Sequence, residues 1–226
     1  MSLQGAVIAF DLDGTLVDTA PDLIGSVNEI LRQEGIEPFS LEAGKKLIGH
    51  GVQAAVQKAF AQKGVELEDG ALDAMVGRFT DIYRGRIALE SRVAEGAPEV
   101  LDQLAAAGAR LAVCTNKRTA LTLQLLDALG LTSRFDAVVG GDLIAQKPDP
   151  RLLRYTIEQA GGDPARALLV GDSYVDQATA RAAGVPVIGF TLGYTDRPLR
   201  PEDFDALTGR FADIPAIAKR LIGRAP

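Results

Sequence analysis

Short apolar runs recur along the chain, and each one ends at a polar residue or a glycine-bearing turn. Runs without polar alternation are typical of strands buried on both faces of a parallel sheet. They lie at residues 6–10, 111–114, 137–139, 167–170 and 187–190. Stretches of helical periodicity separate the last four runs, for example those that close at Gly108 and Gly130. The pattern predicts a doubly wound α/β fold with a mostly parallel, Rossmann-like sheet.

Residues 18–92 break this alternation of strands and helices. Three amphipathic patterns follow one another here, over 23–31, over 52–60 and over 71–87. An all-helical segment placed directly after the first strand is too long for an ordinary crossover. We therefore predict a helical cap domain over 18–92, inserted into an α/β core formed by 1–17 and 93–226. The two hinges are expected near 16–18 and 93–96.

Composition and charge narrow the possible partners. The 226 residues carry a formal net charge of -6, which gives the surface no general attraction for nucleic acid or anionic membranes. No apolar run approaches the roughly 18 residues of a membrane span, and the first residues lack both a basic leader and a long apolar stretch. The single cysteine excludes an internal disulfide. We expect a cytoplasmic protein without nucleic-acid or membrane partners; monomer and homodimer both remain open.

Polar side chains follow four of the predicted strands at the point where each strand ends. In an open α/β sheet the ligand crevice lies beyond the carboxyl ends of the strands, so these residues should meet at one site. In chain order the residues are Asp11, Asp13 and Thr15, with Gly14 to let the chain turn, then Thr115, Asn116 and Lys117, then Lys147 beyond a short connection, and finally Asp172, Ser173 and Asp176. The group would bring together four carboxylates.

Carboxylates held a few ångströms apart raise one another's pKa strongly unless a cation lies between them. A hard divalent cation bound between the carboxylates would relieve this repulsion most simply. Mg²⁺ prefers a few carboxylate and carbonyl oxygens together with water and substrate phosphate, and the predicted group contains neither cysteine nor histidine. The sequence therefore predicts a magnesium site.

The four segments together resemble the ordered motifs of the haloacid dehalogenase superfamily of phosphatases. They are DLDGT at 11–15, Thr115-Asn116, Lys147-Pro148, and the stretch from Gly171 through Asp176. The resemblance covers nearly the whole chain. It implies a Mg²⁺-dependent phosphomonoester hydrolase that works through an aspartyl-phosphate intermediate on a small phosphorylated metabolite.

The resemblance also implies a role for each residue. Asp11 would be the nucleophile, and Asp13 would protonate the leaving alcohol and later deprotonate the hydrolytic water. Lys147 would neutralise charge on Asp11 and the phosphate. The phosphoryl oxygens would be held by Lys147, by the hydroxyl of Thr115, and by the backbone amides of Leu12, Asp13 and Asn116. The magnesium ligands would be Asp11, the backbone carbonyl of Asp13, Asp172 and Asp176.

Several of these residues have simpler interpretations. Asp11 and Asp13 could belong to a turn after a strand, and Lys147 could be a solvated loop lysine. Asp176 could pair across its helix or favour the helix N-terminus. Gly49, His50 and Gly51 could contact substrate from the cap, because the two glycines permit close backbone approach, or could form an ordinary turn between helices.

Longer stretches point to the group of these phosphatases whose cap lies between the first and second motifs. They are DLDGTLVDTAPDL, LIGHGV, CTNK, GGDLIAQKPDP, VGDSYVDQATARAAG and TLGY. The resemblance makes 2-phosphoglycolate the leading candidate substrate, although Ala94 and Glu95 depart from the Pro-Tyr-Pro-Gly pattern common at the second hinge. Pyrophosphate, sugar phosphates and N-acetylmuramic acid 6-phosphate are alternative substrates. A phosphosugar mutase of the β-phosphoglucomutase type and a phosphorylatable binding module are alternative functions.

Overall fold

The computed structural model describes residues 2–49, 51–195 and 197–223, and its centre is a parallel six-stranded sheet. The strand order is β5-β4-β1-β6-β7-β8. The strands are β1 (Val7–Phe10), β4 (Arg110–Thr115), β5 (Ala137–Gly140), β6 (Ala167–Gly171), β7 (Val187–Phe190) and β8 (Ala206–Thr208). The first five confirm the predicted strands. The edge strand β8 was not predicted, because three residues of which only two are apolar carry no recognisable pattern.

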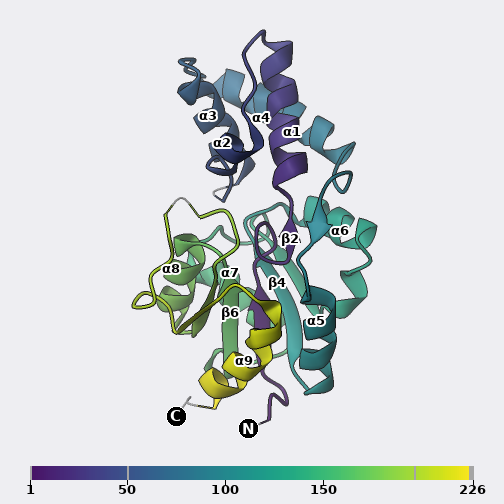
Figure 1. The fold of residues 1–226 in the computed structure, drawn as a ribbon, viewed down its shortest axis with the longest axis vertical. Helices are drawn as coiled ribbons and strands as arrows, with labels where there is room; N and C mark the ends of the chain where they lie inside the picture. Colours follow the sequence, from purple (N-terminus) through teal and green to yellow (C-terminus); the bar gives the residue numbers. More distant parts are fainter. Residues whose placement is uncertain (1, 50, 196, 224–226) are drawn as a thin grey trace.

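Helices cover both faces of the sheet, which confirms the doubly wound α/β class (Figure 1). Their bounds are α5 (Ala97–Ala106), α6 (Thr119–Ala128), α7 (Pro150–Gln159), α8 (Tyr174–Ala183) and α9 (Ile214–Ile222). Alternate residues of β1 serve different cores: Ile8 and Phe10 belong to the apolar cluster with α5, α6 and α9, whereas Val7 and Ala9 belong to the cluster with α7 and α8. Because successive side chains of a strand point to opposite faces of the sheet, β1 contributes to the apolar core on both faces.

The segment between β1 and α5 is helical, as predicted, and lies beyond one end of the sheet (Figure 1). We call these helices the insert: α1 (Ala20–Gln33), α2 (Leu41–Lys45), α3 (Val52–Gln62) and α4 (Asp69–Arg84). The predicted third helix, 71–87, is displaced by two or three residues from α4. The short α2 was missed because five residues show no periodicity. Its N-cap is Ser40, whose side chain accepts a hydrogen bond from the amide of Ala43.

Two short strands join the insert to the sheet. β2 (Val17–Asp18) and β3 (Arg92–Val93) pair antiparallel, with Val17 opposite Val93. A buried carboxylate ties the same two connections together, since Asp22 of α1 accepts hydrogen bonds from the amides of Glu90 and Ser91. The entering and leaving chains thus lie side by side at the predicted hinges. The division into domains at residues 18 and 92 remains a prediction.

None of the helices within the described residues is long and apolar enough to cross a membrane.

Candidate active site

A cavity of about 370 Å³ lies between the carboxyl ends of the central strands and the insert. Its sheet side carries polar side chains that the sequence placed at strand ends: Asp11, Asp13, Thr115, Asn116, Lys147 and Asp172. Its insert side is mostly apolar, with Leu23, Val27, Val52 and Phe79 among the lining residues. The sequence prediction that the four segments meet at one rim of the sheet is therefore realised in the fold.

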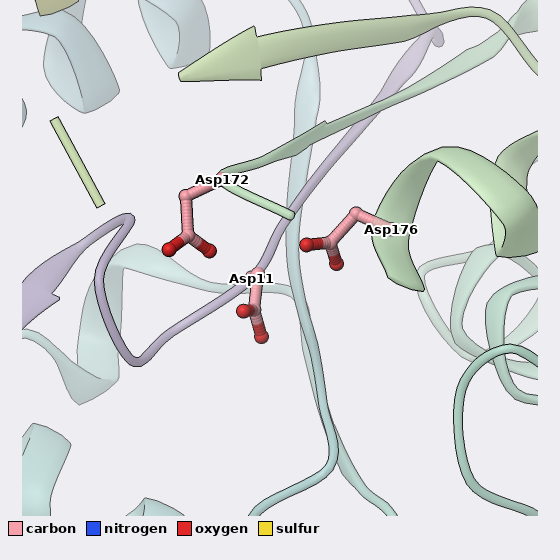
Figure 2. A group of neighbouring side chains, drawn as sticks. All are labelled: Asp11, Asp172 and Asp176. Carbon is pink, nitrogen blue, oxygen red and sulfur yellow. The ribbon is translucent and has the colours of Figure 1, made fainter. Parts of the chain in front are cut away.

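Three buried aspartates form the acidic centre of this site (Figure 2). Each of Asp11, Asp172 and Asp176 places a carboxylate oxygen within 4.8 Å of the others. Asp11 follows β1, Asp172 follows β6, and Asp176 lies in the first turn of α8. Burial raises the pKa of Asp11 to about 6 against the opposing effect of Lys147, and burial followed by the charge of Asp11 raises the pKa of Asp172. The cluster thus favours a cation.

Lys147 supplies one positive charge to the cluster. Its ammonium nitrogen lies 2.8 Å from Oδ1 of Asp11 and 2.6 Å from Oδ1 of Asp176. Burial lowers the pKa of this lysine, but the two carboxylates outweigh that effect and raise the pKa above its ordinary value. The side chain of Asn116 holds the Lys147 backbone, because its Oδ1 accepts from the Lys147 amide at 2.7 Å and its Nδ2 donates to the Lys147 carbonyl at 3.2 Å. Lys147 is therefore not a solvated loop residue.

Asp13 points to a different set of partners. The hydroxyl of Thr19 donates to its Oδ1 at 2.7 Å, and the ammonium of Lys117 donates to the same oxygen at 2.9 Å. Lys117 also lies 4.6 Å from the ring centroid of Tyr83, a residue of α4 in the insert. The carboxylate of Asp13 thus has partners of its own within the same cavity.

Asp172 is held at both of its oxygens. The hydroxyl of Thr15 donates to Oδ1 at 3.3 Å, and the amide of Tyr194 donates to Oδ2 at 2.6 Å. The packing around it requires glycine: a Cβ at Gly14, whose φ is 88°, would lie 2.5 Å from Oδ2, and a Cβ at Gly193 would overlap the same carboxylate. Glycine at position 14 thus serves close packing as well as the turn.

Asp176 has a structural role at the start of its helix and also contacts the lysine of the acidic cluster. It caps α8, since its Oδ2 accepts from the amide of Ser173 at 3.2 Å and from the Ser173 hydroxyl at 2.5 Å. Its Oδ1 contacts Lys147. The carboxylate therefore fixes the helix start and the lysine together.

Of the remaining predicted residues, Thr115, Gly49 and Gly51 line the cavity. The hydroxyl of Thr115 accepts a hydrogen bond from the Lys117 amide at 3.2 Å. Leu12 is fully buried, and its carbonyl accepts from the amide of Val17. Gly49 and Gly51 line the insert side with positive φ values of 112° and 83°. His50 lies outside the described residues.

The profile of the haloacid dehalogenase-like hydrolases matches residues 8–190, which spans the acidic cluster, Lys147 and the insert. The chain belongs to the haloacid dehalogenase-like hydrolase family. This membership confirms the resemblance seen in the sequence motifs, and it makes the chain an enzyme of the hydrolase class.

Relatives of this hydrolase cover almost its whole length. Phosphoglycolate phosphatase from Caulobacter vibrioides is 45% identical over 225 residues, which are 99% of this chain and 95% of the relative. Phosphoglycolate phosphatase from Agrobacterium fabrum is 44% identical over 95% of this chain and 93% of its own. A crystal structure described as a predicted phosphoglycolate phosphatase, from Haemophilus somnus 129PT, has a TM-score of 0.86 and 34% identity, covering 96% of this chain and 99% of that one.

Three residues of this hydrolase's site were given no role by sequence reasoning: Lys117, Thr19 and Tyr194. The only sequence signal that Lys117 belongs to the site was its position two residues after Thr115. Thr19 and Tyr194 reach the site from the insert connection and from the loop after β7, and only the tertiary fold brings them there.

Proposed function

We propose that this hydrolase is a magnesium-dependent phosphatase that acts on small anionic phosphate monoesters, with 2-phosphoglycolate as the leading substrate. The observation that carries the proposal is the meeting of Asp11, Lys147 and Asp172 at one cavity from three separate parts of the chain. An attacking carboxylate, a fixed positive charge and a metal-binding carboxylate suit phosphoryl transfer through an aspartyl-phosphate.

The donor atoms fit Mg²⁺. One oxygen each of Asp11, Asp172 and Asp176 lie within 4.8 Å of one another, and Lys147 is the one ammonium that pairs with Asp11 and Asp176 among the described residues, so the three buried carboxylates retain oxygens for a cation. We expect the ion to be held by Asp11, Asp172 and the Asp13 carbonyl, with Asp176 completing or orienting the shell. Carboxylate and carbonyl oxygens suit a hard ion. When bound, the ion would supply positive charge between the carboxylates and the phosphate.

The residues divide the reaction into two steps. A carboxylate oxygen of Asp11 forms a bond to phosphorus while the bond between phosphorus and the ester oxygen breaks, and Asp13 gives its proton to the departing alcohol. Water then attacks phosphorus, Asp13 takes the proton, and phosphate leaves Asp11. Thr115, Lys147 and the amides of Leu12, Asp13 and Asn116 hold the phosphoryl oxygens throughout.

The substrate assignment is supported by the relatives named phosphoglycolate phosphatase, which are 38–45% identical to this chain. The cavity is lined by Lys117, Arg118 and Lys147 but also by carboxylates, so an anionic ligand there depends on the positive charge of the proposed metal ion as well as on these side chains.

A screen of phosphate release tests the function. The panel contains 2-phosphoglycolate, pyrophosphate, glucose 1-phosphate, glucose 6-phosphate and N-acetylmuramic acid 6-phosphate, each with Mg²⁺ and with EDTA. We expect the highest kcat/KM for 2-phosphoglycolate, and no release with EDTA. Isomerised sugar without free phosphate would instead establish a mutase, and no turnover of any compound or of p-nitrophenyl phosphate would favour a binding module.

A further inference from the structure

Tyr194, in the loop that follows β7, contacts both the acidic cluster and the base of the insert. Its backbone amide donates to Oδ2 of Asp172 at 2.6 Å. Its phenol oxygen accepts from the amide of Ala20, the first residue of α1, at 2.9 Å, and donates to Oδ1 of Asp18 in β2. One residue therefore links a carboxylate of the site to the chain that enters the insert.

The surrounding packing leaves this link little freedom. A Cβ at Gly14 would lie 2.9 Å from Cδ2 of Tyr194, so the aromatic ring rests directly on the loop that follows Asp11. On the other side, Gly193 brings its backbone against the Asp172 carboxylate so closely that no Cβ fits. The ring and the amide of Tyr194 are thus both held at the site.

The phenol is suited to hold the insert as well. Its oxygen accepts from the amide of Ala20 and its proton is donated to Asp18, so both hydrogen-bonding functions of the phenol are used at the base of the insert. Asp18 lies opposite Arg92 in the two-stranded ribbon of β2 and β3. The two partners of the phenol, Asp18 and Ala20, lie where this ribbon meets α1, so a change in the direction of α1 would act on the phenol.

We infer that Tyr194 is a positioning residue that couples the orientation of the insert to the orientation of the Asp172 carboxylate. The part that concerns the metal rests on the proposed function, in which Asp172 binds Mg²⁺. The mechanical part, the contact between the phenol and the insert, stands independently of the reaction.

The variant Tyr194→Phe separates the two ends of the link, because it keeps the ring and the backbone amide but removes both hydrogen bonds of the phenol. We expect faster hydrogen exchange of the Ala20 amide, measured by NMR without substrate. We also expect KM for p-nitrophenyl phosphate to rise by about threefold to tenfold with little change in kcat, because the insert spends less time in the orientation that binds substrate. The increase in melting temperature caused by Mg²⁺ should be retained.

Tyr174→Phe is the matched control. Its hydroxyl lies within hydrogen-bond distance of two acceptors, the Pro198 carbonyl at 3.2 Å and the Asp203 carboxylate at 3.1 Å, farther along the same loop and away from the insert. This variant should leave both Ala20 exchange and KM at wild-type values. If it reproduces the changes of Tyr194→Phe, the effect belongs to the loop in general and the inference is overturned.

Asp18→Ala supplies the second variant. Because Asp18 and Tyr194 share one hydrogen bond, the effects of Asp18→Ala and Tyr194→Phe on KM should be less than additive in the double variant. Additive effects, unchanged Ala20 exchange or an unchanged KM in Tyr194→Phe would each overturn the inference. A wild-type protein that hydrolyses no phosphate ester would contradict the proposed function instead, while the exchange measurement would still test the contact.

Discussion

The ammonium nitrogen of Lys117 lies 2.9 Å from Oδ1 and 3.2 Å from Oδ2 of Asp13, across 104 positions of the chain. Both side chains are largely buried, with 5% of the lysine and 16% of the aspartate exposed. Burial lowers the pKa of Lys117, but the charge of Asp13 and the neighbouring Tyr83 outweigh it and raise that pKa, so the lysine stays charged. The proposed acid and base is therefore fixed by a permanent cation.

The Lys117→Met substitution keeps an unbranched side chain against the Tyr83 ring and removes the positive charge. We expect kcat to fall by about tenfold to a hundredfold, because Asp13 loses the partner that orients it, and general acid–base catalysis contributes about 10²–10⁴. Lys63→Met is the matched control: Lys63 lies 4.3 Å from the Phe39 ring centroid, within the insert. Wild-type kcat in a folded Lys117→Met protein would contradict the positioning role.

Asp11→Asn tests the nucleophile with almost no change in shape. The amide cannot attack phosphorus, so we expect activity to fall more than about a hundredfold and no acid-precipitable phosphoprotein to form. The same substitution at exposed Asp81 of α4 should be silent. A purified variant that keeps more than about one per cent of activity would rule out nucleophilic attack by Asp11.

The stability of Asp11→Asn follows from the direction of the pKa shift. Burial raises the pKa of Asp11 to about 6, so the folded state disfavours the ionised carboxylate, and this cost is fully present above that pH. In EDTA at pH 7.5 the neutral asparagine should therefore give a melting temperature equal to or above that of wild type. At pH 4.5, where Asp11 is protonated in the fold, the difference should shrink. A lower melting temperature at pH 7.5 would contradict this account.

The parts of the site that sequence could predict lie directly after short, fully apolar strands. Asp11 and Asp172 follow β1 and β6, and the carboxyl ends of neighbouring parallel strands share one edge. Residues such as Thr19 and Tyr194 could not be placed in the same way, because their contacts depend on how the ribbon of β2 and β3 and the loop after β7 fold back. The edge strand β8 and the short α2 were missed because neither is long enough to show a period.

The requirement for glycine at position 193 leads to a prediction about metal binding. Gly193→Ala places a methyl group against the Asp172 carboxylate, so we expect the carboxylate to move and the apparent affinity for Mg²⁺ to fall. The measurement is the rise in melting temperature with Mg²⁺ concentration, which depends on the dissociation constant of the folded protein. The melting temperatures are measured without substrate.

Gly77→Ala is the control for that experiment. Gly77 lies within α4, and no heavy atom lies within 4 Å of the position its Cβ would take, apart from those of its own turn and chain neighbours. Alanine should stabilise the helix by about 0.5–1 kcal/mol and leave the response to Mg²⁺ unchanged. Equal Mg²⁺ responses in the Gly193→Ala variant and wild type would contradict the prediction that glycine at position 193 is needed to hold the Asp172 carboxylate for metal binding.

The single thiol, Cys114, offers a probe of the same core. It lies fully buried in β4, and burial raises its pKa to about 12. Since the thiolate is the reactive form, only about one thiol in 10⁴ is ionised at pH 8 and none of it is accessible in the native fold. Labelling by Ellman's reagent should therefore require unfolding.

The rate of that labelling should fall when Mg²⁺ is added. If exposure of Cys114 requires opening of the sheet, and Mg²⁺ binds only the folded site, the open fraction decreases by the factor one plus the ratio of Mg²⁺ concentration to its dissociation constant. Asp172→Asn should abolish the protection by Mg²⁺, and labelling in guanidinium should be complete and independent of the metal. Rapid stoichiometric labelling of the native protein, or protection that persists in Asp172→Asn, would separate the thiol from the metal site and contradict this coupling.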